Sequence, residues 1–323
     1  MDGDLSSGLP LLTTSGNRIV VAKTGQPILL RGINRSGMEH SEPDRDGFCS
    51  AAGISRAEVE FIVRGWNCNI IRVPFNQDWV LNGRKDHSAE EYLKDLDRII
   101  SWAASYGTYT LLDLQWLDAD RVFGGDRNFV APLPNRISID LWALLARRYQ
   151  NEPAVIYDIF TEPHDRLTDD PYPLTREDGS SYPLTQYKVT MAQWKPWAHA
   201  LIKAIRAVSP LALIFVSGTD WGYDLRGMPL NASNLVYSTH VYRNKGSNWP
   251  EAFGNLAMKY PVFAAEWGGG RQDREWARRL LRYFDELKIG WAAWSWSNEP
   301  LLVSRNLPTH FGKVVREALW SSA

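Results

Sequence analysis

This sequence has few cysteines, no long apolar runs and no excess of either charge. Two cysteines occur in 323 residues, Cys49 in a loop-like stretch and Cys68 before an apolar run, so no disulfide framework is expected. The formal net charge of -1 offers no electrostatic basis for binding nucleic acid or an acidic membrane. No apolar stretch approaches the roughly 18 residues of a membrane-spanning helix. These absences favour a globular protein whose partner is uncharged.

The composition allows one large core. Hydrophobic residues make up 44% of the chain and charged residues 23%, and a chain of this length can bury about three quarters of its unfolded surface in one domain. We therefore predict a single domain over residues 1–323, in which residues 1–16 form an extended segment. The polar start, Met1 to Ser7, has no apolar signal core, which fits a cytoplasmic protein or a mature sequence without its leader.

Short apolar runs alternate with helical patterns along the chain. We predict an opening hairpin from residues 18–22 and 27–31, and then strands at 29–34, 69–73, 109–114, 154–160, 211–216, 235–240, 262–265 and 290–294. Capping boxes at Ser55 and Ser88 predict two helix starts. Further helices are predicted at 137–149, 186–208, 272–287 and 313–320, whereas the helix expected after the fifth strand has no visible pattern. Eight strands alternating with helices predict an α/β fold, a (β/α)8 TIM barrel behind a short N-terminal β-hairpin.

Two of the predicted strands end in a glutamate that turn residues follow directly. Glu162 ends the fourth run and precedes Pro163, and Glu266 ends the seventh. The two glutamates are 104 residues apart, or three to four units of about 30 residues each. Strands three apart in an eight-membered ring face each other, so both carboxyl groups are expected at the C-terminal mouth of the barrel, where barrel enzymes hold their active sites.

Tryptophan is abundant, with 15 residues, and several follow predicted strands. Core packing explains many tryptophans, but flat aromatic faces at strand ends are also the surfaces on which sugar rings stack. Trp116, Trp221 and Trp267 are therefore candidate subsite aromatics. Tyr223 is expected to line the same cleft as Trp221.

Two facing carboxyl groups suit retaining glycoside hydrolysis. One protonates the leaving oxygen while the other, about 5–5.5 Å away, attacks the anomeric carbon. This chemistry needs neither a metal nor a cofactor, and none is predicted. Arg72, at the end of the second strand, and Tyr242, after the sixth, are suited to keep the attacking carboxylate ionised. For Arg72 the structural alternative is a buried ion pair with Asp113 or Asp158.

These motifs resemble glycoside hydrolase family 5, the retaining (β/α)8 enzymes of the cellulase and mannanase group, over nearly the whole chain. Several elements in one order are more specific than a lone Glu-Pro pair. The matching elements are Leu30-Arg31-Gly32-Ile33-Asn34, Gly65-Trp66-Asn67, Ile71-Arg72-Val73-Pro74, Glu162-Pro163, His240-Val241-Tyr242, Ala265-Glu266-Trp267-Gly268 and Trp294-Ser295-Trp296.

The resemblance implies a role for each matched side chain. Glu162 would be the acid/base and Glu266 the nucleophile. Arg72 and Tyr242 would hydrogen-bond the nucleophile. His240 would lie beside the reacting sugar, and Trp294 would form the platform under it. Asn34 would support the end of the first strand. A core role is the alternative for His240 and for Trp294.

Two positions depart from the family pattern. Thr161 stands where the family usually has an asparagine that binds the 2-hydroxyl of the reacting sugar, and Gln115 stands where a histidine is usual. Threonine has one hydroxyl instead of an amide, and glutamine cannot carry charge. Rate and sugar preference are therefore open, although both carboxylates remain.

The loop at residues 165–186 contains a ten-residue echo. Tyr172-Pro173-Leu174-Thr175 returns as Tyr182-Pro183-Leu184-Thr185, around a central turn of Glu177-Asp178-Gly179-Ser180. A small hairpin beside the cleft is predicted, with Tyr172 and Tyr182 bordering a subsite. The alternative is a solvated insertion whose repeat is chance.

The sequence therefore predicts a monomeric, secreted or periplasmic, endo-acting retaining β-1,4-glucanase, and a cytoplasmic location stays open. Its expected partner is a β-linked polysaccharide or oligosaccharide. A β-mannanase and an exo-β-glucosidase are alternatives within the same class. A glycan-binding barrel with little catalysis is the alternative from another class, motivated by Thr161 and Gln115.

Overall fold

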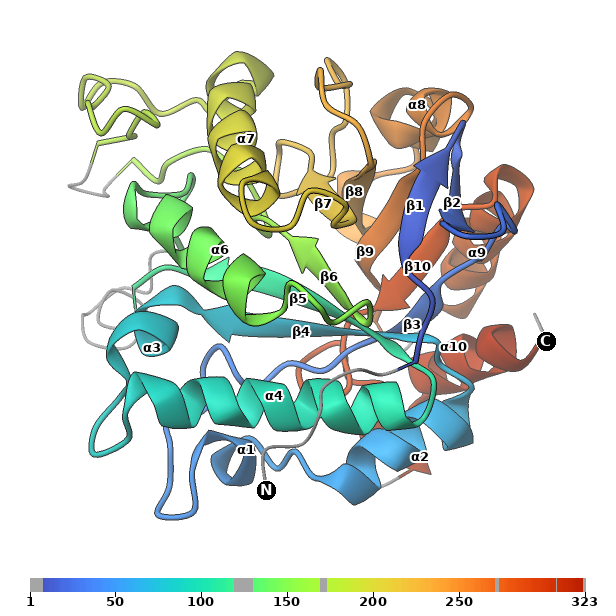
Figure 1. Cartoon of the computed structure of the whole chain (residues 1–323). Coiled ribbons are helices and arrows are strands. Elements are labelled where there is room, and N and C mark those ends of the chain that lie inside the picture. Colours follow the sequence, from blue (N-terminus) through green and yellow to red (C-terminus); the bar gives the residue numbers. More distant parts are fainter. Residues whose placement is uncertain (1–7, 119–129, 169–172, 271–272, 306, 322–323) are drawn as a thin grey trace.

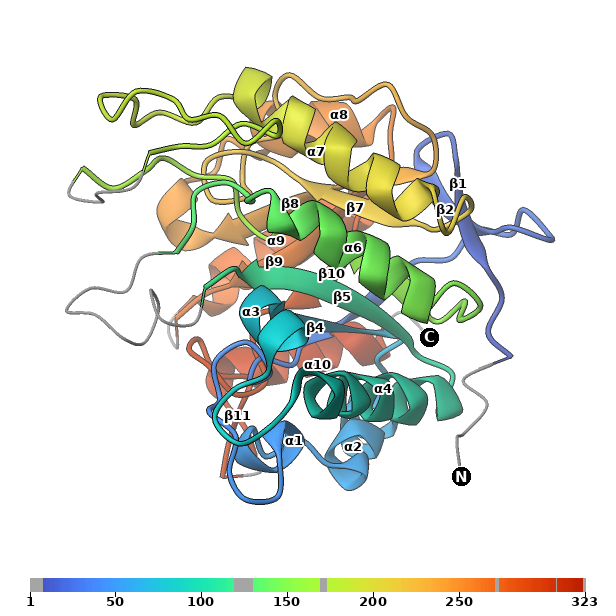
Figure 2. The same ribbon diagram turned by 60° about the vertical axis from the view of Figure 1, so that its left-hand side comes forward.

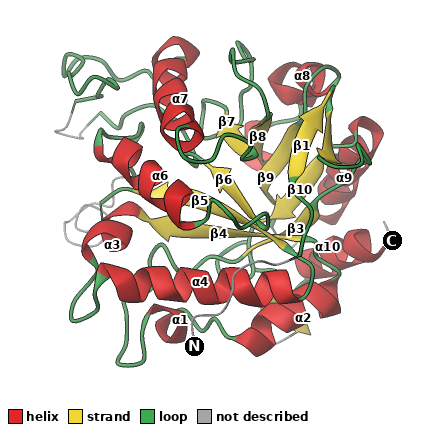
Figure 3. Cartoon of the chain, in the orientation of Figure 1, coloured by secondary structure: helices red, strands yellow, loops and turns green. Residues whose placement is uncertain are grey.

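The fold is a closed barrel of parallel strands surrounded by helices (Figures 1 and 3). The computed structural model describes residues 8–118, 130–168, 173–270, 273–305 and 307–321. Around the barrel the strands follow the chain, β3-β4-β5-β6-β7-β8-β9-β10, and β10 closes the ring by pairing with β3. The predicted (β/α)8 architecture is confirmed.

The barrel strands are buried along almost their whole length, because the helices cover the outside and side chains fill the inside. Each predicted run overlaps one observed strand, but the bounds differ. For example, 154–160 is a strand only over β6, and 211–216 begins later, at β7, because Leu211 lies exposed in the preceding turn. The strands are β3 (Arg31–Asn34), β4 (Ile70–Asn76), β5 (Tyr109–Trp116), β6 (Val155–Asp158), β7 (Ile214–Ser217), β8 (Leu235–Tyr242), β9 (Val262–Gly268) and β10 (Gly290–Ala293).

Both predicted helix starts are confirmed. The hydroxyl of Ser55 accepts from the backbone N–H of Glu58, and Ser88 forms a complete capping box with Glu91. No helix lies in the fully described segment 218–234 between β7 and β8, the place where no helical pattern was visible in the sequence. The helices are α1 (Phe48–Ala51), α2 (Arg56–Trp66), α3 (Gln77–Asn82), α4 (Ala89–Ser105), α6 (Ile137–Arg148), α7 (Met191–Arg206), α8 (Asn255–Ala257), α9 (Arg274–Leu287) and α10 (His310–Trp320).

The N-terminal hairpin exists, and its predicted arm at 18–22 is confirmed as β2, but the other arm was predicted wrongly. Strand β1 (Leu12–Ser15) pairs antiparallel with β2 (Arg18–Val21) around a turn at Gly16, whose φ of 56 suits glycine. The expected second arm, residues 27–31, contributes only an isolated bridge between Val20 and Pro27. Residues 12–15 are thus a strand rather than part of an extended segment.

The hairpin lies at the N-terminal end of the barrel. Leu12 and Ile19 belong to the same buried cluster as Leu30, Ile70 and Tyr109, which stand at strand beginnings. In Figure 2 the hairpin lies at the right, away from the long loops at the left. The C-terminal mouth is therefore left open for the site.

Both cysteines are buried and free.

Within the described part of the chain, no helix has the length and apolar character needed to cross a membrane.

Candidate active site

The two glutamates meet at the mouth of the barrel. Glu266 lies within β9, the seventh barrel strand, and Glu162 follows β6, the fourth. One carboxylate oxygen of each, together with a ring nitrogen of His240, lie within 4.8 Å of one another. The predicted juxtaposition across the barrel is confirmed.

His240 bridges the two carboxyl groups. Its Nδ1 atom lies 2.8 Å from Oε1 of Glu162 and 3.6 Å from Oε2 of Glu266. Gly222 packs against the imidazole, where an added Cβ would lie 2.8 Å from the ring, and its φ is 72. Only glycine allows this approach, so the loop after β7 positions the histidine.

Arg72 is the buried cation beneath the site. Its Nη1 atom donates to Oε1 of Glu266 at 2.8 Å and its Nε atom to Asp158 at 2.9 Å, while Nη2 lies 2.8 Å from Asp113. Nη1 also donates to Oδ1 of Asn34 at 2.9 Å. Arg72 is therefore both a partner of Glu266 and a buried ion-pair partner of both aspartates, so the two interpretations of this residue hold together.

One guanidinium faces three buried carboxyl groups, which bears on their protonation. Burial raises the pKa of Asp113 well above its usual range, against the lowering effect of Arg72, and the charges of Asp158 and Glu266 raise it further. Burial also raises the pKa of Asp158. The same guanidinium therefore acts against the effect of burial at both aspartates.

Asn34 and Tyr242 complete the surroundings of Glu266. The amide nitrogen of Asn34 donates to the carbonyl oxygens of Ala265 and Ala292 at 2.8 and 3.1 Å, which ties β3 to β9 and β10. The hydroxyl of Tyr242 donates to Oε2 of Glu266 at 2.7 Å. Burial raises the pKa of Tyr242 well above its ordinary value, and the charge of Glu266 raises it further, so the phenol remains a donor.

The surroundings push the two glutamate pKa values in opposite directions. Burial raises the pKa of Glu162, and the charge of Glu266 adds to this against the hydrogen bond from His240. Burial would also raise the pKa of Glu266, but the electrostatic interactions with His240 and Arg72 and the hydrogen bond from Tyr242 outweigh it and lower that pKa below its usual range. Paired carboxyl groups of opposite shift are what acid and nucleophile roles require.

Thr161 and Gln115 are in direct contact. The hydroxyl of Thr161 accepts from Nη2 of Arg72 and donates to Oε1 of Gln115, both at 3.2 Å. Thr161 is fully buried, whereas Gln115 is half-buried. The two positions that depart from the family pattern therefore form one hydrogen-bonded pair.

Three of the candidate aromatic side chains are half-buried near the mouth: Trp294, Trp221 and Trp116. The ring of Trp221 stacks on His164 with 3.6 Å between centroids and 13° between planes, and His164 Nδ1 lies 2.6 Å from the backbone oxygen of Glu162. Trp221 is thus held beside Glu162. Sequence reasoning missed His164, and its place two residues after Glu162 was the available signal.

Two aromatic predictions were wrong. Trp267 is fully buried and packs edge-on against Trp291 and Phe311, between the barrel and its outer helices. Strand alternation explains this, because residue 267 points away from the face that carries Glu266. Tyr223 is 7% exposed and packs on Phe253, so it does not line an open cleft.

The predicted hairpin in the loop after β6 is confirmed. Thr175 and Ser181 form an antiparallel bridge, and the N–H of Tyr182 donates to the backbone oxygen of Leu174 at 2.8 Å. Tyr182 is half-buried, with the guanidinium of Arg176 3.8 Å from its ring centroid. The other predicted subsite border, Tyr172, lies outside the described residues.

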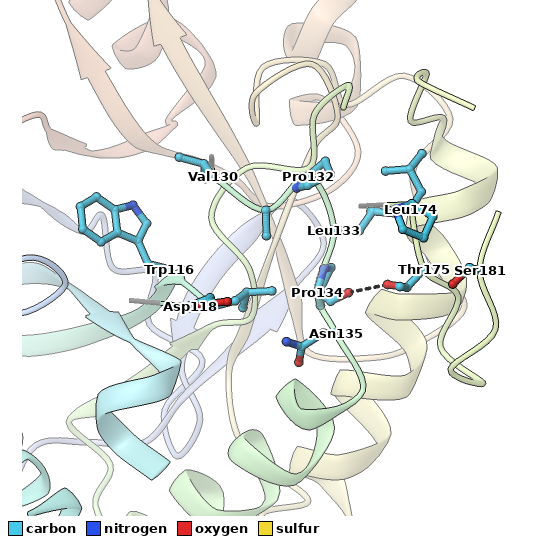
Figure 4. Close-up of a pocket in the computed structure, with 13 residues that line it drawn as sticks. Trp116, Asp118, Val130, Pro132, Leu133, Pro134, Asn135, Leu174, Thr175 and Ser181 are labelled. Atoms are coloured by element: carbon cyan, nitrogen blue, oxygen red, sulfur yellow. Dashed lines mark hydrogen bonds between the residues drawn. The ribbon is translucent and has the colours of Figure 1, made fainter. Parts of the chain in front are cut away.

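A pocket of about 320 Å³ lies between the end of β5, segment 130–135 and this hairpin. Figure 4 shows Trp116 on one side and Leu174 with Thr175 on the other. The N–H of His164 donates to the backbone oxygen of Pro132 in the pocket wall at 3.2 Å. The pocket therefore adjoins the segment that carries Glu162 and does not lie over the two glutamates.

The side chains of Glu162, His240 and Glu266 are also spaced so that they could hold a metal ion. Each already has a protein partner, because His240 contacts Glu162, and Arg72 and Tyr242 contact Glu266. Glycoside hydrolysis by two carboxyl groups does not require a metal ion.

A parallel eight-stranded barrel with two facing carboxyl groups at its mouth defines a class, the barrel glycoside hydrolases. The family model "Cellulase (glycosyl hydrolase family 5)" matches residues 21–300, and the chain belongs to this family.

Curated relatives are similar at low identity. "Endoglucanase E-5" of Thermobifida fusca is 22% identical over 85% of this chain, which spans 53% of that protein's length. An endoglucanase of Paenibacillus polymyxa is 24% identical over 87% of this chain and 78% of its own. The chain thus spans about half the length of the first of these relatives.

Solved structures share the fold. The β-glucanase SdGluc5_26A of Saccharophagus degradans, in complex with cellotetraose, has a TM-score of 0.75 at 21% identity, covering 97% of this chain and 94% of that one. The catalytic domain of the Thermobifida fusca endoglucanase Cel5A has a TM-score of 0.71 at 20% identity, covering 98% of this chain and 100% of that one. At these identities the likeness concerns the fold alone.

Proposed function

We propose that this protein is a retaining, endo-acting β-1,4-glucanase that cleaves by double displacement. The observation that carries the proposal is that one carboxylate oxygen of Glu162 lies within 4.8 Å of one of Glu266 at the barrel mouth, with the pKa of Glu162 raised and that of Glu266 lowered. Retaining hydrolysis needs this short separation, since a longer one would leave room for the water of an inverting mechanism.

In the first step, Glu266 attacks the anomeric carbon while Glu162 donates its proton to the departing glycosidic oxygen. The bond from the anomeric carbon to that oxygen breaks as the bond to the Glu266 carboxylate forms. Arg72 and Tyr242 hold Glu266 ionised and oriented until it attacks. In the second step, Glu162 removes a proton from water, which attacks the anomeric carbon and releases Glu266.

The remaining side chains have supporting roles in this proposal. His240 orients Glu162 and lies beside the reacting sugar, and Asn34 fixes the strand ends behind Glu266. Trp294 forms the platform under the reacting sugar. Trp221 stacks on the leaving-group side, because it is held against the segment that carries Glu162. Trp116 contacts a more distant sugar.

A β-1,4-glucan is the proposed substrate. The curated relatives are named endoglucanases, and two solved structures of similar fold contain cellotetraose. We further propose that residues 1–323 form one catalytic domain that acts as a monomer without cofactor, and that the protein is secreted or periplasmic, since its polymeric substrate lies outside the cell.

The test is release of reducing sugar from a soluble cellulose derivative, mixed-linkage glucan, mannan and xylan. We expect activity on the first two, with a fall in viscosity that outpaces sugar release, as internal cleavage requires. Faster cleavage of mannan would make the protein a mannanase, and release of glucose alone would make it an exo-β-glucosidase. Oligosaccharide binding with no turnover of any polymer or aryl glycoside would contradict an enzyme.

A further inference from the structure

Most polar groups around the two glutamates are already bonded to one another. The N–H groups of Arg72 face carboxylates, Asn34 and Thr161. The amide nitrogen of Asn34 donates to backbone carbonyls, and the hydroxyl of Tyr242 donates to Glu266. Few donors in this layer are therefore available to a substrate hydroxyl.

Among the described residues, Nε2 of His240 and Nε2 of Gln115 are two groups near the glutamates without a hydrogen bond. His240 is fully buried, whereas Gln115 is half-buried, so Gln115 is the better placed of the two to meet a substrate. Arg72 can only donate, so the hydroxyl of Thr161 accepts from it, and this hydroxyl donates its single hydrogen to Oε1 of Gln115. The carbonyl oxygen of Gln115 therefore faces Thr161, and its Nε2 group points elsewhere. Among the described residues, no hydrogen bond of this Nε2 group is found.

The backbone brings Gln115 to this place. Phe75 of β4 pairs with Leu114, and the next residue, Asn76, pairs with Trp116, so Gln115 is the extra residue of a β-bulge. Bulges beside active sites redirect a side chain. The N–H of Thr161 donates to the backbone oxygen of Leu114 at 3.1 Å, which holds the segment before Glu162 against the bulge. Gln115 is half-buried there, so part of its surface is exposed.

We propose that Nε2 of Gln115 donates a hydrogen bond to the 2-hydroxyl of the sugar that Glu266 attacks, with Thr161 as the residue that orients the amide. The inference rests on the proposed function. Attack by Glu266 brings the anomeric carbon to its carboxylate, and the 2-hydroxyl is on the adjoining carbon. Arg72 links Glu266 to Thr161, and Thr161 contacts Gln115, so the free amide lies in the same layer. Hydrogen bonds to this hydroxyl strengthen in the transition state.

The test compares two substrates with one variant. The substrates are an aryl β-cellobioside and the same compound without the 2-hydroxyl on the sugar that is attacked. Gln115→Met keeps the length of the side chain and removes the donor. We expect kcat/KM to fall about 10- to 100-fold on the parent substrate and less than about threefold on the 2-deoxy substrate. Equal falls on both substrates, or no fall on the parent, would overturn the proposal.

A second variant tests the orienting role of Thr161. Thr161→Val keeps the shape and removes the hydroxyl, so the amide of Gln115 can rotate. We expect a fall of about 3- to 10-fold on the parent substrate alone. An equal fall on the 2-deoxy substrate would overturn the role of Thr161. If Gln115→Met failed to fold, the same result would overturn the whole proposal. Gln150→Met, an exposed position between α6 and β6, is the matched control.

The two proposals fail in different ways. A native chain without activity on either substrate would overturn the proposed function and this inference with it. An active native chain whose Gln115→Met variant loses the same factor on both substrates would leave the proposed function intact and overturn the inference alone.

Discussion

The Nη1 atom of Arg72 lies 2.8 Å from Oε1 of Glu266, although 194 residues separate the two in the chain. Both side chains are buried, and the same guanidinium contacts Asp158 and Asp113 one layer below. The carboxylate at the barrel mouth is therefore joined to the charges inside the barrel. Its lowered pKa depends in part on this cation.

Replacing Arg72 should damage both stability and activity. Arg72→Met leaves three buried carboxyl groups without their cation, and breaking a buried pair of this kind costs about 3–5 kcal/mol of unfolding free energy. We also expect kcat to fall about 100- to 1000-fold, since Glu266 loses a preorganised donor. Urea unfolding and initial rates would measure the two effects. Arg45→Met is the control, because the side chain of Arg45 is 93% exposed and should matter for neither.

The pH profile of kcat/KM should be bell-shaped. Glu266 must be ionised, so activity should be lost as pH falls through its pKa, which lies below the ordinary 4.5. Glu162 must be protonated, so activity should be lost as pH rises through its pKa, which lies above 4.5. In Glu162→Ala, measured with an aryl glycoside whose leaving group needs no protonation, the basic limb should disappear while the acidic limb stays. If both limbs of the pH profile survive in Glu162→Ala, the assignment of Glu162 as the acid is contradicted.

Azide should distinguish the two glutamates by stereochemistry. In Glu266→Ala, azide can occupy the space of the lost carboxylate and attack directly, which gives a glycosyl azide of inverted configuration. In Glu162→Ala, azide can attack the glycosyl-enzyme, which gives the retained product. NMR of the products measures the outcome. Equal residual activity in both variants would contradict the division of roles.

Two tryptophans that look alike in sequence should respond differently to substitution. Trp267→Ala removes a buried ring and should lower the unfolding free energy by about 3–5 kcal/mol. Trp221→Ala should change stability much less and raise KM for cello-oligosaccharides about 2- to 10-fold, through loss of a stacking face. Thermal unfolding and steady-state kinetics separate the two. A raised KM with unchanged stability in Trp267→Ala would contradict a core role and would indicate that Trp267 contacts the substrate.

A chelator should leave activity unchanged, because both chemical steps use side chains alone. Added zinc should inhibit, since imidazole and carboxylate oxygens suit this ion and Glu162, His240 and Glu266 lie within 4.8 Å of one another. Inhibition competitive with substrate is the expected pattern. Loss of activity after dialysis against a chelator, restored by a divalent ion, would contradict the mechanism.

Much of the fold was predictable because it depends on local patterns. The apolar runs, and the caps at Ser55 and Ser88, predicted the barrel and two of its helix starts. One arm of the hairpin was wrong because the run at 27–31 looks as strand-like as β1, and only packing of Leu12 and Ile19 under the barrel decides between them.

The sequence by itself determined the two carboxyl groups and their strands, because each glutamate lies where an apolar run meets turn residues. The barrel topology then brings the ends of both strands to the same mouth. It could not decide which tryptophans face the cleft, since one residue along a strand reverses the face, as Trp267 shows beside Glu266. Nor could it join Thr161 to Gln115. That contact depends on a bulge in β5 and on the packing of the segment before Glu162 against it, which only the tertiary structure decides.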